Sequence, residues 1–218
     1  MKRTPWLLIT LILILGVSSL PASADTFFSN FGTNNDYNCC TGGTIGGPNS
    51  PVGWIIQANE FTAGFSGSVS QIDAAIGFVT GTNGATISLW TDNAGIPAAM
   101  LGSWDVTNLP NFGTCCAVAT VTGISGINLT AGTNYFLEVS APDPTWDAWN
   151  WNSIGDTGLV DFTFDGGQTW NQAPGSTRYA FDVLGNPGGG GVPEPASLIM
   201  LGSGLIAAAG TIRRRFQK

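Results

Sequence analysis

Short runs in which apolar and polar residues alternate follow one another along the middle of the chain. In residues 69–79, for example, Ile72, Ala74, Ile76 and Phe78 occupy every second position. Neighbouring side chains of a β-strand point to opposite faces, so this period of two predicts a strand with one face on a core. No window between the two ends has the 3.6-residue apolar period of an amphipathic helix. The pattern therefore predicts an all-β fold.

Ten segments with strand character are separated by turns rich in Gly, Asn and Pro. The expected strands cover residues 25–31, 54–61, 69–79, 85–90, 100–106, 116–122, 135–140, 148–152, 159–164 and 178–184. Many short strands punctuated by turn residues are typical of two packed antiparallel sheets. We therefore expect one antiparallel β-sandwich, jelly-roll-like, at residues 25–185, followed by a flexible Gly-rich linker at residues 186–191.

The N-terminal residues 1–24 have the composition of a secretory signal peptide. Lys2 and Arg3 precede an apolar run, and Ala22 and Ala24 supply an A-x-A cleavage site. We expect a helical segment that signal peptidase removes after Ala24. An N-terminal membrane anchor is the alternative, but the apolar run is short for one and the cleavage site follows directly.

The C-terminal residues 192–218 have three parts: a Pro-Glu-Pro tripeptide, an apolar run at residues 196–212, and a basic cluster. As a helix the apolar run would be about 26 Å long, against a bilayer core of roughly 30 Å. It therefore predicts a short transmembrane helix with the basic cluster on the cytoplasmic side.

These three parts, in this order and behind a signal peptide, resemble the PEP-CTERM sorting signal of Gram-negative bacteria that make exopolysaccharide. The resemblance implies recognition by an exosortase, an integral-membrane transpeptidase-like enzyme, and removal of the tail near Pro195. It implies an exported protein, anchored transiently in the inner membrane and then placed at the cell surface or in the extracellular matrix. A permanent anchor that keeps residues 213–218 is the alternative. The residues that carry the resemblance are Pro193, Glu194, Pro195, Arg213, Arg214 and Arg215.

Charge is unevenly distributed along the chain. Residues 25–185 hold 13 of the 14 acidic residues and only one basic residue, Arg178, which gives this domain a net charge of −12. Such a surface repels a phosphate backbone, so we expect no nucleic-acid partner. The chain has no histidine, which excludes Ser-His-Asp and Cys-His catalysis. Glu138 lies in an alternating strand and is expected on its solvent face. Because no acid–base pair of carboxylates stands out, we expect a protein that is not an enzyme.

The four cysteines form two vicinal pairs, Cys39-Cys40 and Cys115-Cys116. In an exported chain they favour disulfides. An antiparallel alignment of the pairs would place Cys39 opposite Cys116 and Cys40 opposite Cys115, with one bridge on each face. A vicinal bridge within each pair is the alternative. Zinc binding is disfavoured, because adjacent cysteines without histidine lack the spacing of zinc ligands.

Oxygen-bearing side chains gather late in the chain, among Asn residues and glycines. Calcium prefers six to eight oxygen ligands, so a candidate calcium site is predicted here, although solvated turns give the same pattern. The carboxylates concerned are Asp143, Asp147, Asp156, Asp161 and Asp165.

Tryptophans concentrate in the same region. Exposed indole rings are flat apolar platforms on which sugar rings stack, and flanking Asp and Asn side chains can bind hydroxyl groups. Packing in the sandwich core is the alternative. The candidate carbohydrate-binding residues are Trp146, Trp149, Trp151 and Trp170.

Three further segments, residues 88–97, 129–135 and 165–170, more loosely resemble the β-sandwich modules that PEP-CTERM proteins often carry. They imply a fold and no activity. The sequence thus predicts an exported surface or matrix protein with a structural or interaction role. A carbohydrate-binding module is the alternative, and a polysaccharide-active enzyme is a remote one.

Overall fold

The structure, a computed structural model, describes residues 24–188 of the chain. The expected transmembrane helix, the sorting tail and most of the expected signal peptide, including Ala22, lie outside this range. Within it there are fourteen strands and no helix. The strands are β1 (Asp25–Ser29), β2 (Tyr37–Gly46), β3 (Ile56–Thr62), β4 (Gly67–Ala74), β5 (Ile76–Thr80), β6 (Gly84–Asp92), β7 (Pro97–Thr107), β8 (Ala119–Thr122), β9 (Asn128–Leu129), β10 (Asn134–Ser140), β11 (Trp146–Asn152), β12 (Thr157–Thr163), β13 (Asn171–Thr177) and β14 (Phe181–Pro187).

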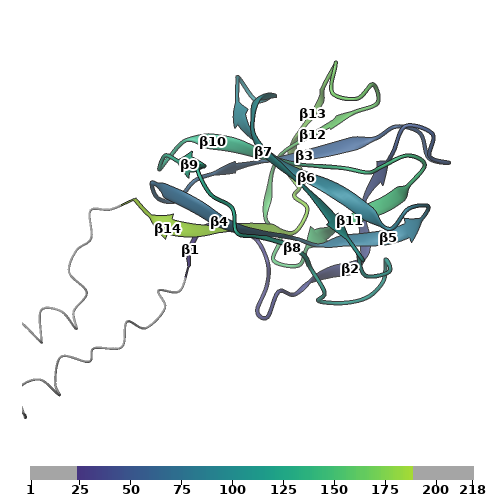
Figure 1. Ribbon diagram of the computed structural model, residues 1–218, viewed down its shortest axis with the longest axis horizontal. Helices are drawn as coiled ribbons and strands as arrows, with labels where there is room; N and C mark the ends of the chain where they lie inside the picture. The colour runs from purple at the N-terminus through teal and green to yellow at the C-terminus, as the bar shows by residue number, and fades with distance from the viewer. Residues whose placement is uncertain (1–23, 189–218) are drawn as a thin grey trace, which may run out of the picture.

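Three antiparallel sheets make up the domain (Figure 1). One has the order β1-β14-β4-β8, with β9 also paired to β4, and the second has the order β13-β12-β3-β10-β6-β7. The chain alternates between these two sheets as it passes through β1, β3, β4, β6, β8, β10 and β14, and its last strand pairs with its first. This is the connectivity of a jelly roll, so the predicted jelly-roll-like sandwich is confirmed.

The third sheet, β2-β11-β5, is added to the jelly roll. It joins the first sheet at Ala75, the residue between β4 and β5, where the Ala75 amide donates to Ala180 O (3.0 Å) and the Ala180 amide donates to Asn150 O (2.8 Å). The two smaller sheets therefore form one bent layer that faces the six-stranded sheet.

The core fills the space between these layers. All three sheets contribute side chains with no exposed surface, among them Ile72, Ile87, Leu137, Trp149 and Phe181. In strands such as β6 and β10, alternate residues point into this core, as the period-two pattern predicts.

The outer face of the six-stranded sheet is also covered. Ala58 and Phe136 point away from the core and are nevertheless fully buried. The Gln172 side chain in β13 donates to the backbone oxygen of Gly95 in the β6–β7 turn, so the two ends of this sheet meet over its outer face. Glu138, on the same face as Phe136, is only 7 % exposed. The expectation that it faces solvent is wrong, because the curled sheet closes over it.

Several predicted boundaries need correction. The expected strand at residues 69–79 is two strands in different sheets, since the chain turns at Ala75. β2 and β13 lie outside the ten expected strands, and both are edge strands rich in Gly, Asn or Pro. Asn186 and Pro187 belong to β14 and pair with β4, so the expected linker begins at least two residues later than predicted. No helix within the described range is long and apolar enough to cross a membrane.

Candidate functional site

Trp151, in β11, lies on the wall of two apolar grooves and is 37 % exposed. In the pairing of β11 with β2, Asn150 is opposite Gly42, whereas Trp151 is opposite Asn38. Residues 39–41 therefore form a β-bulge, which interrupts the ladder beside Trp151. This interruption leaves the indole ring at the surface.

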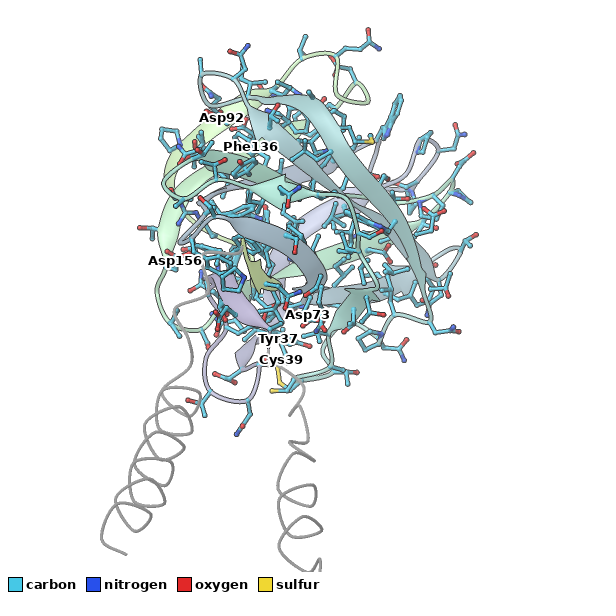
Figure 2. The ribbon with its side chains drawn as sticks, turned by 60° about the vertical axis from the view of Figure 1, so that its left-hand side comes forward. Tyr37, Cys39, Asp73, Asp92, Phe136 and Asp156 are labelled. Carbon is cyan, nitrogen blue, oxygen red and sulfur yellow. A yellow bond between two sulfur atoms is a disulfide. The ribbon has the colours of Figure 1, made fainter. Side chains whose placement is uncertain are left out.

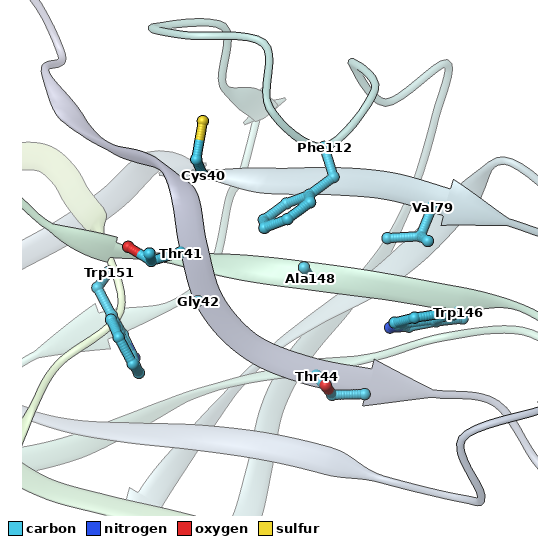
Figure 3. A pocket seen from close by; sticks show the side chains of 9 residues that line it. All are labelled: Cys40, Thr41, Gly42, Thr44, Val79, Phe112, Trp146, Ala148 and Trp151. Carbon is cyan, nitrogen blue, oxygen red and sulfur yellow. The ribbon is translucent and has the colours of Figure 1, made fainter.

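The β2 groove, named after the strand that crosses it, has a volume of about 400 Å³. Trp146 and Trp151 lie on either side of β2, and Phe112 lies on the same side of this strand as Trp146 (Figure 3). Phe112 approaches β5 because Gly77 has no side chain; a Cβ atom there would lie 2.8 Å from the Phe112 Cα. The thiol of Cys40 is at the rim.

The β12 groove has a volume of about 440 Å³ and lies between Trp151 and the β12–β13 hairpin. Its aromatic lining includes Phe162 and Phe164, whose rings meet edge to face at 5.5 Å. Tyr179 also lines it and stacks on Trp149 at 5.1 Å between ring centroids. The Tyr179 hydroxyl fits over β2 because Gly43 has no Cβ atom.

The four predicted tryptophans have different environments. Trp149 has no exposed surface and its indole nitrogen donates to Ala180 O (3.0 Å), so it is a core residue and the prediction of a sugar platform is wrong for it. Trp170 lines neither groove. Trp146 and Trp151 share the β2 groove, and Trp151 alone of the four reaches the β12 groove. The structure therefore brings two of the four together.

The five predicted carboxylates are not brought together. Asp143 accepts hydrogen bonds from the Asn49 amide and side chain. Asp156 forms an ion pair with Arg178 at 3.2 Å. Asp165 organises its own turn, accepting hydrogen bonds from the hydroxyl groups of Thr163 and Thr169, which hold its pKa down at about 2.

The other two carboxylates, Asp147 and Asp161, are fully buried, and neither has a hydrogen-bond partner within residues 24–188. Burial raises the pKa of Asp147 to about 7. Burial, and then the negative charges of Glu60 and Asp92, raise the pKa of Asp161 to about 7. Both side chains are therefore held in the protonated form below neutral pH.

Across the described part of the chain, no three Asp, Glu or Cys side chains lie close enough to hold a metal ion. The five late carboxylates belong to separate turns and strands, so their closeness in sequence does not produce a shared oxygen cage. Calcium binding by them remains a prediction that this arrangement does not favour.

The disulfide joins Cys39 to Cys115, 76 residues apart. A cross-link between the two pairs is thus present, but the expected partners, Cys39 with Cys116 and Cys40 with Cys115, are wrong. Cys40 and Cys116 are both exposed and are not joined to another cysteine within residues 24–188. The expected antiparallel strand alignment fails because Cys115 and Cys116 lie in a loop before β8, where Cys116 has a positive φ of 65°.

Sequence reasoning missed Gln57, Phe162 and Phe164 of the β12 groove. A signal was present, because Val160, Phe162 and Phe164 are apolar at every second position and continue past the end of the strand. Phe164 is 60 % exposed, the largest exposed fraction among the large apolar side chains of the described region. Gln57 gave no such signal.

Residues 191–215 match the PEP-CTERM protein-sorting motif. The chain carries a PEP-CTERM sorting signal. The match spans the Pro-Glu-Pro tripeptide and all three arginines of the basic cluster, which are the predicted sorting residues. The PEP-CTERM motif marks an exported protein that is sorted by an exosortase.

No curated protein and no solved structure matches the chain. The PEP-CTERM match covers the tail and says nothing about the task of the sandwich. That task has to be argued from the grooves.

Proposed function

We propose that the protein is a non-enzymatic interaction protein of the bacterial envelope or exopolysaccharide matrix. The observation that carries the proposal is the PEP-CTERM motif, which follows an acidic, all-β domain in the same chain. Such a domain is a rigid scaffold that presents loops and sheet edges to its surroundings. Fold alone does not specify activity, so the role is argued from destination and surface.

In this proposal the tail is a temporary anchor. The apolar run at residues 196–212 holds the chain in the inner membrane with the basic cluster inside, and cleavage near Pro195 then releases or transfers the domain. The last strand of the sandwich, β14, ends at Pro187, eight residues before Pro195 of the expected processing site.

Localisation of the full chain and of a chain lacking residues 192–218 tests this destination. We expect the full chain at the surface or in the matrix and the truncated chain in the periplasm or medium. Mass spectrometry of the mature protein is the second readout. If it still contains residues 213–218, the tail is a permanent anchor and the processing step is wrong.

A second candidate function is polysaccharide binding by the sandwich. It is supported by Trp151, an exposed indole ring shared by two apolar grooves. Flat aromatic surfaces beside hydroxyl and amide groups are common in sites for sugars and other small molecules. Co-sedimentation of the purified chain with insoluble polysaccharides tests this candidate, and an absence of binding to every polysaccharide would rule it out.

A further inference from the structure

We propose that the β12 groove is the polysaccharide site and that its ligand is an uncharged glycan chain. This inference rests on the second candidate function and deepens it by naming the site and the ligand class. The groove is made by Gln57, Trp151, Phe162, Phe164, Ser176 and Tyr179, together with apolar neighbours.

Charge is the first argument. None of the ten residues that line the groove carries a charge, although the surrounding domain has 13 acidic residues and one arginine. An acidic polysaccharide would approach a strongly negative domain and find no cation in the groove to pair with. An uncharged glycan is not repelled by the negative domain and needs no cation in the groove.

Aromatic exposure is the second argument. Trp151 is 37 % exposed and Phe164 is 60 % exposed, and both line the groove. Exposed rings of this size are costly in water unless a partner covers them. The apolar face of a pyranose ring covers such a surface while its hydroxyl groups remain at the edges.

An unpaired amide is the third argument. Gln57 is 8 % exposed, and its Nε2 donates to Thr44 O at 3.0 Å, whereas its Oε1 has no hydrogen-bond partner within the described residues. A buried acceptor without a partner is unfavourable. A sugar hydroxyl group supplies the missing donor. A purely apolar ligand such as an acyl chain would leave the Gln57 oxygen unpaired.

The hydroxyl groups of Ser176 and Thr177 complete the arrangement on the β13 side of the groove. The site thus combines apolar rings with a few neutral donors and acceptors. Its volume of about 440 Å³ lies within the range of ligand sites, roughly 300–1,000 Å³. This combination fits a polyhydroxylated, uncharged ligand.

The test uses the full-length chain in a mild detergent and calorimetric titration with three probes: a soluble β-glucan, a soluble mannan and the polyanion alginate. We expect binding to at least one neutral glycan, with an affinity that changes little between low and high salt. Trp151→Ala should weaken that affinity at least tenfold, and Gln57→Leu should weaken it severalfold.

Matched controls are available on the same surface. Trp54 is 39 % exposed and Ile154 is 57 % exposed, and neither lines the groove, so Trp54→Ala and Ile154→Ala control for Trp151→Ala and Phe164→Ala. Each variant must keep the melting temperature of the wild type to within a few degrees; a variant that does not is replaced by Trp151→Phe or Phe164→Leu.

The outcomes distinguish a failure of this inference from a failure of the second candidate function, polysaccharide binding. Neutral-glycan binding that Trp151→Ala and Phe164→Ala both reduce, and that Trp54→Ala and Ile154→Ala do not, supports both. Because Trp151 also lines the β2 groove, binding that Trp151→Ala reduces and Phe164→Ala does not overturns the assignment to the β12 groove. Glycan binding unaffected by Trp151→Ala and Phe164→Ala overturns the groove assignment and leaves polysaccharide binding intact. Binding to alginate alone overturns the ligand class. No binding to any probe overturns the inference, and co-sedimentation with insoluble polysaccharides then decides the second candidate function separately.

Discussion

Trp149 and Trp151 are two residues apart in β11 and differ completely in exposure. Trp149 is sealed in the core between Tyr179 and Phe181, and its indole nitrogen is satisfied by Ala180. Trp151 lies beside the β2 bulge and remains exposed. Both residues belong to one strand. Trp151 differs from Trp149 because the partner strand β2 bulges beside it, and the sequence pattern of β11 does not show this bulge.

Trp149→Ala should therefore be strongly destabilising. Removing a fully buried indole leaves a cavity and typically costs about 3–5 kcal/mol. Urea denaturation followed by circular dichroism measures the loss. Ile154→Ala, at a more exposed site, is the control and should change the free energy of unfolding by less than about 0.5 kcal/mol. Equal effects of the two changes would contradict the assignment of Trp149 to the core.

Asp73 and Asp182 are directly opposite each other on β4 and β14 and are 5 % and 7 % exposed. Burial, and then the negative charge of Asp73, raise the pKa of Asp182 to about 7. At neutral pH and above, ionisation of Asp182 therefore opposes folding, since two carboxylates would be buried side by side.

Asp182→Asn tests this pair. The folded-state pKa of Asp182 lies above its unfolded value, so its contribution is most favourable in acid and is lost as pH rises toward about 7. Asparagine cannot ionise, so the stability of the variant relative to the wild type should rise by roughly 2–3 kcal/mol between pH 5 and pH 8. Denaturation at both pH values measures it. Exposed Asp25→Asn is the control, and a relative stability independent of pH would contradict the coupling.

At the scale of elements, the segment before β8 is tied to β2 by two kinds of bond. Cys39 is joined to Cys115, and the Tyr37 hydroxyl lies 2.9 Å from both Thr114 O and Ala117 O. Tyr37 and Cys39 lie together at one end of the domain, far from Asp92 and Phe136 at the other (Figure 2). A small apolar cluster of Tyr37, Ala75 and Ala180 lies beneath this segment.

Cys115→Ser should loosen this segment and the whole domain. A disulfide that closes a loop of this length typically stabilises a fold by about 2–4 kcal/mol, mainly by restricting the unfolded chain. Thermal melting without reductant measures the loss. Cys40→Ser is the matched control, because Cys40 adjoins the same bridge and is not joined to another cysteine within the described residues. A larger effect of Cys40→Ser would mean that the bridge is assigned to the wrong cysteine.

Strand alternation predicted most of the jelly roll, because strands such as β6, β10 and β14 have core-facing apolar residues at every second position. It could not predict β2 or β13. Their residues are largely Gly, Asn, Thr and Pro, and they are strands because a neighbour offers a hydrogen-bonding edge. The β2 groove is built on one of these edge strands and the β12 groove on the other. The sequence pattern therefore predicted the grooves less well than the rest of the fold.

The same limit applies to the individual site residues. Trp151 was among the candidates because exposed aromatic residues near polar ones suggest a platform. Gln57 was not, since an unpaired buried oxygen depends on where Thr44 and the rest of β2 lie in space. The late carboxylates looked like a cluster only because they are close in sequence.

At the scale of the whole molecule, four carboxyl groups have a pKa raised to about 7, chiefly by burial: Glu138, Asp147, Asp161 and Asp182. They lie in all three sheets. Each binds a proton in the folded state that it releases in the unfolded state between about pH 4 and pH 7. The folded domain therefore takes up protons on folding in this interval.

The melting temperature should accordingly fall as pH rises from about 4 to about 7 and then level off. Calorimetric melting across pH 4–9 at constant ionic strength measures it. The raised pKa values fix the sign, since stability falls wherever the folded state holds more protons than the unfolded one. A melting temperature that increases with pH over this interval would contradict the burial of these carboxyl groups in protonated form.

The position of β14 has a mechanical consequence for a domain held by its C-terminus. The strand runs from Phe181, two residues after Tyr179 of the β12 groove, to Pro187, beyond which the sorting tail follows. In the proposed function, a glycan in the β12 groove and an attachment at the C-terminus would load opposite ends of a span of roughly 25 Å. Tension between them acts along β14, which is held between β1 and β4. Because antiparallel hydrogen bonds run across the strands, such tension shears both ladders at once, and no bond can be opened singly. An attachment at this end of the domain would therefore resist pulling along the strand.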